Sequence, residues 1–525
     1  MTPTEEAARR RTFAIISHPD AGKTTLTEKF LLYGGALSLA GSVRARRGAR
    51  AATSDWMELE RQRGISITST VLQFPYRGCT LNLLDTPGHR DFSEDTFRVL
   101  AAADAAVMVL DAAKGIEPQT LKLFEVCRDR GIPLLSFLNK YDRPGLPPLE
   151  LLDDIENRLG LRATPVTWPV GVDGDFRGVV DRRTGSFVRF TRTARGATAA
   201  PEEILTVERA SAEEGRPWAA AAEELELLSA VGADVDVKSF VAGESTPVFA
   251  GSALTNFGVR LLLDAVVDLA PSPLPRADQA GTVRHLDAPF SGFVFKVQAN
   301  MDPSHRDRIA FVRVCSGQFE RGMVVTHGAT GKPFATKYAH SVFGQERETI
   351  DEAWPGDVIG LVNATDVRVG DSLWLDEPVT FPTIPTFAPE HFSVARVRDT
   401  GRFKQFRRGI AQLDEEGVVQ VLRDRDLGDQ APTLAAVGPM QFEVAIHRLE
   451  HEFGAPVELI PTGYRFARRT DAESASTLRA MHGVDVLARA DGTLLALFES
   501  PFWLERVLRE QPELTLAPLV GEGLS

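Results

Sequence analysis

Short apolar runs alternate with amphipathic stretches through the first half of this chain, and the alternation predicts a parallel sheet covered by helices. The predicted strands lie at 13–16, 70–76, 80–84, 105–110, 133–138 and 247–250. The predicted helices lie at 25–32, 91–102, 118–130 and 259–269. The expected fold is therefore α/β, with a doubly wound, mostly parallel sheet.

The pattern changes after the Pro-rich stretch 270–275, which is typical of a stiff linker. From about 282 to 378, short strands with glycine turns and no long helix predict a small β-barrel. From 388 to 525, strand and helix signals alternate again and predict a C-terminal α+β domain. We expect three domains, at 1–276, 282–378 and 388–525, with an insertion at 157–246 inside the first.

Composition narrows the class of protein. The chain has 525 residues and a net charge of −13, which argues against a general nucleic-acid coat protein, and no DNA partner is expected. Its three cysteines have no paired spacing, so neither a zinc site nor a disulfide framework is expected. The N-terminus has no apolar signal core, and no run approaches the roughly 18 apolar residues of a membrane span. The expected location is the cytoplasm, without a membrane partner.

The apolar run at 13–16 leads into a polar loop and then a helix. Backbone N–H groups at the start of this helix can cradle a β-phosphate, Lys23 can reach the β- and γ-phosphates, and the Thr24 hydroxyl can ligate Mg²⁺. Ser17 stands where the full phosphate-loop pattern has glycine, so a plain strand–turn–helix corner is the alternative interpretation. The candidate nucleotide-binding residues of this loop are Ser17, His18, Pro19, Asp20, Ala21, Gly22, Lys23, Thr24 and Thr25.

A second polar segment follows the predicted strand at 80–84. Asp85 stands where a carboxylate in the second coordination shell of Mg²⁺ belongs, and Gly88 lets the backbone approach a γ-phosphate. His89 would orient the attacking water, or it is a solvated turn residue. Ser66 would place its hydroxyl on Mg²⁺, or it merely begins a strand. The candidates in the second segment are Asp85, Thr86, Pro87, Gly88 and His89.

Two further polar loops follow the predicted strands at 133–138 and 247–250. The Asp142 carboxylate can accept hydrogen bonds from N1–H and the 2-amino group of guanine, and adenine offers neither donor. The candidate base-recognising residues are Asn139, Lys140, Asp142, Ser252, Ala253 and Leu254. Because the carboxyl ends of parallel strands meet at one edge of a sheet, the four segments together predict a site for GTP and Mg²⁺.

Three charged segments have two interpretations each. The acidic, helical stretch 201–247 is a solvated face or a docking surface for a basic protein. The basic residues of 402–408 form a solvated face or contact RNA phosphates, which would be those of ribosomal RNA under the resemblance given below. The cluster of His305, Arg306 and Arg308 touches RNA or forms a solvated hairpin tip.

Taken together, several motifs resemble the translational GTPase family, and within it the release factor 3 family. They read SHPDAGKT, SDWMELERQRGISIT, DTPGHRDFSEDT, NKYDRPG and GSALTNFGV. The resemblance implies that Ser66 is the switch hydroxyl and that the ribosome places His89. It also implies an apolar gate beside that histidine, formed here by Ile65 and Pro19.

The resemblance implies a ribosome-dependent GTPase of translation termination. Such a protein is expected to be a monomer that binds the ribosome and promotes dissociation and recycling of class I peptide chain release factors after peptide release. The chain lacks the further domains that elongation factor G uses to reach the decoding centre, which argues against a translocase or ribosome-protection factor. A GTP-regulated subunit of a metabolic enzyme, such as sulfate adenylyltransferase, is the rival from another class. The long insertion and the third domain argue against it.

Overall fold

The computed structural model describes residues 1–36, 69–172, 174–193, 197–299, 308–343, 346–362, 364, 366–382, 384, 387–425 and 428–519. The chain divides into two compact units. Unit 1 comprises Met1–His89, Thr96–Phe295 and Ile309–Pro382. Unit 2 comprises Arg90–Asp95, Lys296–Arg308 and Thr383–Ser525.

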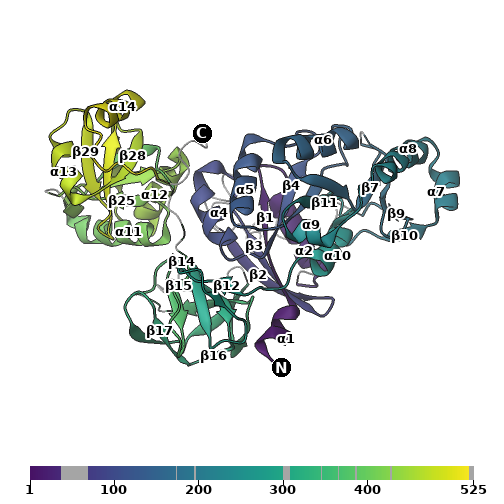
Figure 1. Cartoon of the computed structure of the whole chain (residues 1–525), viewed down its shortest axis with the longest axis horizontal. Helices are drawn as coiled ribbons and strands as arrows, with labels where there is room; N and C mark the ends of the chain where they lie inside the picture. Colours follow the sequence, from purple (N-terminus) through teal and green to yellow (C-terminus); the bar gives the residue numbers. More distant parts are fainter. Residues whose placement is uncertain are drawn as a thin grey trace. The chain divides into compact units, whose positions relative to one another are not determined.

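Unit 1 contains a seven-stranded sheet in the order β2-β3-β1-β4-β5-β11-β6 (Figure 1). Its strands are β1 (Arg10–Ser17), β2 (Thr70–Tyr76), β3 (Cys79–Asp85), β4 (Ala105–Asp111), β5 (Leu134–Asn139), β6 (Arg162–Pro165) and β11 (Ser245–Ala250). All neighbouring strands are parallel except β2, which pairs antiparallel with β3. The prediction of a doubly wound, mostly parallel sheet is confirmed.

Helices cover both faces of this sheet (Figure 1). They are α2 (Lys23–Tyr33), α4 (Ser93–Leu100), α5 (Pro118–Asp129), α6 (Pro148–Leu159) and α10 (Val259–Leu269), with the 3-10 turn η1 (Arg90–Phe92) before α4. The short helix α1 (Pro3–Ala8) precedes β1. Phe13 and Ile15 of β1 pack with α2 and α10 in one core, whereas the alternate residues Ala14 and Ile16 are buried on the opposite face. Because both faces are covered, the strands read as continuous apolar runs.

The segment between β6 and β11 forms its own four-stranded antiparallel sheet, in the order β10-β9-β8-β7. The strands are β7 (Thr167–Val170), β8 (Gly178–Asp181), β9 (Ser186–Phe190) and β10 (Glu202–Leu205), and the helices are α7 (Val207–Glu214), α8 (Arg216–Ala230) and α9 (Val237–Val241). The range expected for the insertion, 157–246, thus begins with the end of α6 and with β6, which belongs to the seven-stranded sheet. We use "insertion" below for residues 167–241.

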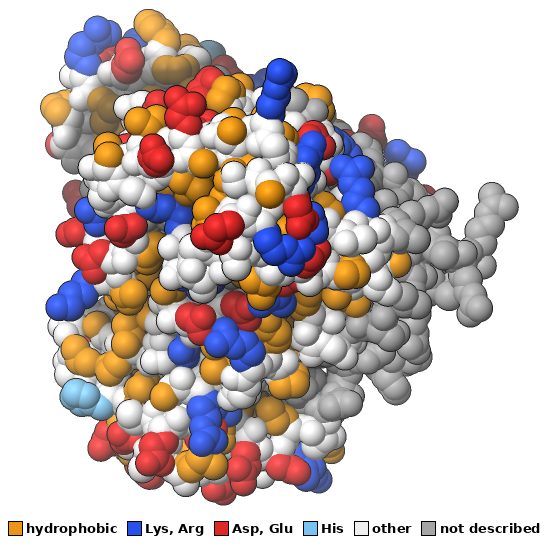
Figure 2. Space-filling model, turned by 90° about the vertical axis from the view of Figure 1, so that its right-hand side faces the viewer, with side chains coloured by type: hydrophobic (Ala, Val, Ile, Leu, Met, Phe, Trp, Pro, Cys, Tyr) orange, Lys and Arg blue, Asp and Glu red, His pale blue; other side chains and the backbone are white. Residues whose placement is uncertain are grey.

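Five of the eleven acidic residues in the stretch 201–247 form ion pairs with arginines. Arg189 lies within ion-pair distance of Glu203, Glu213 and Glu214, and Arg260 binds Glu202 at 2.5 Å. Figure 2 views the molecule from the end that carries α7 and α8, and acidic, basic and apolar side chains are interspersed on that face. This pairing neutralises part of the acidic stretch, and both interpretations of it stay predictions.

The barrel region of unit 1 is an eight-stranded sheet in the order β18-β17-β23-β14-β15-β22-β19-β20. Its strands are β14 (Ser291–Ala299), β15 (Arg308–Ser316), β17 (Val324–His327), β18 (Lys332–Ala335), β19 (Ala339–Phe343), β20 (Glu346–Thr349), β22 (Val358–Val362) and β23 (Ser372–Trp374). Short ladders join β12 (Arg276–Ala277) to β13 (Val283–Arg284) and β16 (Phe319–Glu320) to β21 (Glu352–Ala353). The described part of this region contains no helix, in agreement with the prediction of short strands without a long helix.

Unit 2 is built in four layers. Its first sheet has the order β25-β26-β24-β27, with β24 (His391–Val397), β25 (Gln420–Leu422), β26 (Thr433–Ala436) and β27 (Val457–Pro461). Its second sheet has the order β28-β30-β29, with β28 (Phe466–Thr470), β29 (Val484–Ala488) and β30 (Leu494–Phe498). The helices are α11 (Phe403–Glu416), α12 (Pro439–His451), α13 (Ala472–Arg479) and α14 (Pro501–Glu510), with short 3-10 turns η3 (Thr400–Arg402) and η4 (Gly428–Gln430).

The cores of unit 2 show how these layers stack. Leu434 packs with α11 and α12, while its neighbour Ala435 packs with Leu487 and Leu497 of the second sheet. Successive strand residues face opposite sides, so β24, β25 and β26 each contact both a helix layer and the other sheet. Helices α13 and α14 cover the outer face of the second sheet. The predicted C-terminal α+β domain is confirmed.

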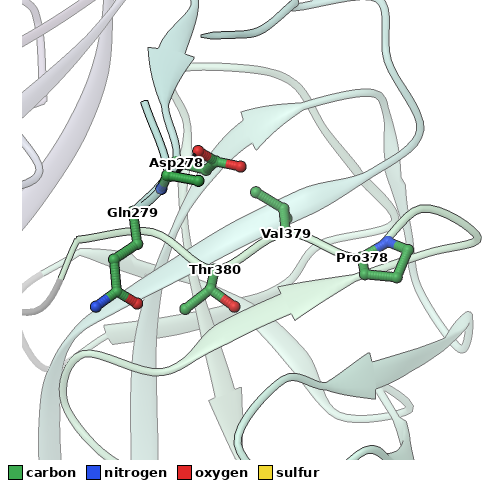
Figure 3. Close-up of a pocket in the computed structure, with 6 residues that line it drawn as sticks. Asp278, Gln279, Pro378, Val379 and Thr380 are labelled. Carbon is green, nitrogen blue, oxygen red and sulfur yellow. Dashed lines mark hydrogen bonds between the residues drawn. The ribbon is translucent and has the colours of Figure 1, made fainter. Parts of the chain in front are cut away.

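A hollow of about 430 Å³ lies in the barrel region, between the segments 278–280 and 378–380 (Figure 3). The one ionisable group that lines it, Asp278, accepts hydrogen bonds from the N–H groups of Ala280 and Thr282 at 2.9 and 2.8 Å. The carboxylate is thus already used in a turn, and the hollow offers little ligand chemistry.

Among the described residues, no helix is both long and apolar enough to span a bilayer.

Candidate functional site

The loop between β1 and α2 is shaped around Gly22. This residue has φ +102°, and a Cβ there would lie 2.3 Å from Asn139 Nδ2, so only glycine fits. Glycine supplies no side chain to cap the first N–H groups of α2. An uncapped helix N-terminus that follows a tight loop is suited to receive a phosphate group.

The predicted loop at 85–89 lies beside this phosphate loop. Strands β1 and β3 are paired so that Ile15 is opposite Asp85. Lys23 Nζ donates to Asp85 Oδ1 at 2.7 Å, and both side chains are buried. A Cβ added at Gly88 would lie 3.8 Å from Pro19 Cα and 3.9 Å from Lys23 Cε. Lys23 and Asp85 here neutralise each other. A bound phosphate could replace Asp85 as the partner of the lysine, and a cation could replace Lys23 as the partner of the aspartate.

The loop at 139–142 connects the phosphate loop to the fourth segment. Asn139 Nδ2 donates to the carbonyl of Ala21 at 2.7 Å, and its Oδ1 accepts from the N–H of Ala253 at 2.8 Å. Asp142 Oδ1 accepts from the Ser252 hydroxyl at 2.5 Å. Together with the Lys23–Asp85 contact, these hydrogen bonds connect all four predicted segments.

Lys140 and Asp111 form a second connection at this edge. Lys140 has φ +75° and donates from Nζ to Asp111 Oδ2 at 2.7 Å. Burial pushes the pKa of Asp111 upwards, but hydrogen bonds from Lys140 and from the N–H of Ala113 outweigh it, so that the net shift is downward. Asp111 stays ionised and fixes the lysine that follows Asn139.

His18 in the phosphate loop is almost fully buried, with 1% exposure. Its Nε2 lies 2.7 Å from Glu117 Oε2, at the start of α5, although the pair lacks hydrogen-bond geometry. Burial lowers the pKa of His18 below its ordinary value, while the charge of Glu117 acts in the opposite direction. Glu117 and Asp111 carried no motif in the sequence, so pattern analysis missed them.

The remaining predicted residues have the following places. Ser17, Thr86 and Ser252 are buried, His89 is half-buried, and Asp20 and Leu254 are exposed. Thr86 donates its hydroxyl hydrogen bond to the carbonyl of Ile15 at 2.6 Å. Ser66, Ile65, His305 and Arg306 lie outside the described residues, so their predicted roles stay predictions.

Family comparisons cover almost the whole chain. Residues 8–272 match the elongation factor Tu GTP-binding domain, residues 289–375 match elongation factor G domain 2, and residues 381–508 match the C-terminal domain of class II release factor RF3. A solved crystal structure of a Thermus thermophilus protein superposes with a TM-score of 0.70 at 24% identity, covering 88% of this chain and 70% of that one, and so shares the fold.

Curated relatives are similar over their full length. A peptide chain release factor 3 of Gloeobacter violaceus is 51% identical over 528 residues, covering 99% of each chain. One of Microcystis aeruginosa is 50% identical over 99% of this chain and 97% of its own, and one of Symbiobacterium thermophilum is 49% identical over 97% of each.

Fold, phosphate loop and matched domains together define a GTPase of the translation-factor class. Within that class, the match of residues 381–508 identifies the family, because the matched C-terminal domain is that of release factor RF3 and not that of a translocase or a metabolic GTPase. The chain belongs to the peptide chain release factor 3 family. It is therefore a GTP-binding, GTP-hydrolysing enzyme of translation termination.

Proposed function

We propose that this chain uses GTP on the ribosome to drive class I peptide chain release factors off after peptide release, so that these factors can be reused. The observation that carries the proposal is the combination of a GTPase domain with a C-terminal domain of the release factor 3 type. Partners are the ribosome and the class I factors, and the protein acts as a cytoplasmic monomer. The functional domains are 1–276, 282–378 and 388–525.

The four loops have separate tasks in this proposal. Residues 17–25 bind the phosphates, and Lys23 transfers its contact from Asp85 to the phosphate oxygens when GTP enters. Gly88 is placed beside the phosphate loop, where its N–H can report the γ-phosphate. His89 orients the attacking water, and Asp142 with the loop 252–254 selects guanine.

The donor set around Lys23 fits Mg²⁺. A buried aspartate beside a phosphate loop and a threonine at the first turn of α2 are oxygen ligands of the kind Mg²⁺ prefers, with the rest supplied by phosphate and water. Thr24 and Ser66 would hold the ion directly, and Asp85 would act through water. Bound Mg²⁺ would neutralise part of the negative charge of the phosphates. The chain's own residues hold GTP, exclude adenine nucleotides and place the water.

A direct test follows the class I factor. A fluorescent class I release factor is bound to ribosomes after peptide hydrolysis, and its dissociation is recorded with and without this protein and GTP. We expect GTP to accelerate dissociation and to permit many rounds of release. With a non-hydrolysable GTP analogue the class I factor should still leave, because binding of the GTP form to the ribosome is enough to displace it. This protein should remain on the ribosome, because its own release requires GTP hydrolysis.

The result that contradicts the proposal is an unchanged dissociation rate under GTP, with ribosome-stimulated GTP hydrolysis intact. That result would move the assignment to another ribosome-associated task. Absence of any ribosome stimulation would instead question the link to the ribosome itself.

A further inference from the structure

Four aromatic rings form a continuous cluster behind the predicted base-recognising loops. The centroid of Tyr141 lies 5.5 Å from that of Phe176, and Phe176 lies 5.8 Å from Phe257. Phe257 and Phe190 are stacked at 4.9 Å with an interplanar angle of 22°. All four residues are at most 6% exposed. We call Tyr141, Phe176, Phe190 and Phe257 the ring cluster.

Two members of the ring cluster belong to the base-recognising loops. Tyr141 directly precedes Asp142, and its N–H donates to the carbonyl of Gly251 at 3.2 Å. Phe257 exchanges both backbone hydrogen bonds with Ser252, at 2.9 and 3.1 Å. Because Ser252 in turn binds Asp142, the two rings are attached to the backbone on either side of the Asp142–Ser252 contact.

The other two members belong to the insertion. Phe176 lies just before β8, and Phe190 is the last residue of β9. The insertion also approaches the aspartate loop through its backbone, since a Cβ added at Gly174 would lie 3.9 Å from the carbonyl oxygen of Asp142. The insertion therefore packs against both base-recognising loops at once.

Packing, rather than hydrogen bonding, holds Tyr141 in the cluster. Its hydroxyl is buried and has no hydrogen-bond partner among the described residues. Burial raises the pKa of the Tyr141 hydroxyl far above its ordinary value, and the charge of Glu224 adds to the effect. A phenol in such surroundings contributes through its ring, because the unpaired hydroxyl is a cost rather than a gain.

We propose that the insertion positions the guanine-binding loops through this ring cluster, so that Phe176 and Phe190 are positioning residues for guanine specificity and for nucleotide release. Removal of Phe176 takes a neighbouring ring from both Tyr141 and Phe257, and removal of Phe190 takes one from Phe257. In either case the Asp142–Ser252 pair is no longer held in position. The proposal deepens the function given above and rests on the assignment of Asp142 to guanine.

The chain offers a matched control on the same strand. Phe187 and Phe190 are three residues apart on β9, so their side chains point to opposite faces of the sheet. Phe187 is fully buried and packs edge-to-face with Trp218 of α8, 5.7 Å away and separate from the ring cluster. Phe187→Ala therefore removes a buried ring of the same insertion without touching the base-recognising loops.

The experiment compares wild type with Phe176→Ala, Phe190→Ala and Phe187→Ala. It measures the dissociation rate of a fluorescent GDP, the affinities for GTP and for ITP, and the thermal unfolding temperature. ITP lacks the 2-amino group, one of the two donors to Asp142, so the GTP:ITP affinity ratio reports the position of that carboxylate. We expect Phe176→Ala and Phe190→Ala to speed GDP release and lower the GTP:ITP ratio, each by about 2- to 10-fold, the range for loss of one ring pair.

Phe187→Ala should lose thermal stability as much as Phe190→Ala while keeping the wild-type ratio and release rate. Tyr141→Phe should keep the ratio, since only the unpaired hydroxyl is removed. If an alanine variant does not fold, Phe176→Leu and Phe190→Leu keep apolar volume without a ring, and they should shift the ratio in the same direction.

Two different failures are distinguishable. A ratio and release rate in the Phe176 and Phe190 variants equal to those of Phe187→Ala would overturn the positioning role and leave the insertion a separate body. A wild-type protein that does not prefer GTP over ITP would instead overturn the assignment of Asp142, and with it the proposed base recognition.

Discussion

A few side chains at one sheet edge have the proposed roles of selecting the nucleotide and starting its hydrolysis. Asn139 contacts both the phosphate loop and the loop at 252–254 through one amide group. An amide can donate and accept at the same time, which a carboxylate or an ammonium group cannot. Such residues are sensitive to small substitutions, because every alternative leaves a buried polar group unpaired.

The substitution Asp142→Asn should change base preference from guanine to xanthine. Asparagine replaces one acceptor oxygen by an N–H₂ donor, which suits the 2-carbonyl of xanthine and opposes the 2-amino group of guanine. We expect XTP to bind more tightly than GTP to this variant, measured by competition against a fluorescent nucleotide. A variant that still prefers GTP would contradict the assignment, provided its thermal unfolding matches that of wild type.

The substitution His89→Ala should keep GTP affinity and remove most ribosome-stimulated turnover. The expected loss is large because activators of GTPases contribute about 10³- to 10⁵-fold through the groups they position. Single-turnover hydrolysis with saturating ribosomes measures the loss, and equilibrium binding provides the control. Unimpaired turnover in this variant would show that another group orients the water.

At the scale of single elements, helix α11 of unit 2 buries a carboxylate whose charge opposes folding. Asp414, near the end of α11, accepts a hydrogen bond from the N–H of Val421 at 2.9 Å. Burial raises the pKa of Asp414 to about 6, although Val421 and Arg423 act in the opposite direction. In the unfolded chain an aspartate titrates near a pKa of about 3.9. The charged form of Asp414 therefore opposes folding above about pH 6, and this cost disappears as the pH falls towards about 4.

Asp414→Asn keeps an acceptor for Val421 and removes the charge. We expect it to raise the free energy of unfolding by about 1 to 3 kcal/mol at about pH 7.5 and by about a third of that at about pH 4.5, since a pKa difference of one unit corresponds to about 1.4 kcal/mol. Denaturant unfolding at the two pH values measures this, with Glu505→Gln, an exposed position, as the control. Equal gains at both pH values would show that burial of the charge is not the cause.

At the scale of the whole molecule, buried polar contacts join the seven-stranded sheet to the barrel region inside unit 1. Arg313 of β15 is 1% exposed, donates to Asp104 Oδ2 at 2.6 Å and also binds the carbonyl of Ala102. Arg10 of β1 donates from Nε to Asp357 Oδ2 at 2.7 Å. These contacts connect two regions that the sequence separates by a proline-rich linker, and we expect the two regions to unfold together.

Arg313→Met should destabilise unit 1 by about 1 to 3 kcal/mol, because the carbonyl of Ala102 loses the buried Arg313 donor and Asp104 is left with Arg276, at 3.6 Å. Arg321→Met is the matched control in the same barrel region. Arg321 and Asp351 form an exposed pair at 2.7 Å, and its loss should cost less than about 1 kcal/mol. Calorimetry measures both. Similar small losses in the two variants would show that the Arg313 contact does not hold the regions together.

Local patterns predicted much of this structure. Helix α10 spans the predicted 259–269, and β2 spans the predicted 70–76, because hydrophobic periodicity is a local property. The same patterns missed α1 and α6 and did not reveal that β2 runs antiparallel to its neighbour. The direction of a strand depends on how the chain connects it to its neighbour in the sheet, and a short window of sequence does not contain that information.

The sequence by itself determined the class of site, since glycine, lysine, aspartate and asparagine at strand ends have the chemistry that phosphate and guanine require. Tertiary structure alone decided what supports these residues. Glu117 beside His18, Asp104 beside Arg313, and Phe176 and Phe190 behind the base-recognising loops carry no motif. Their roles come from packing between segments far apart in the chain, and burial and proximity act only once the fold has brought those segments together.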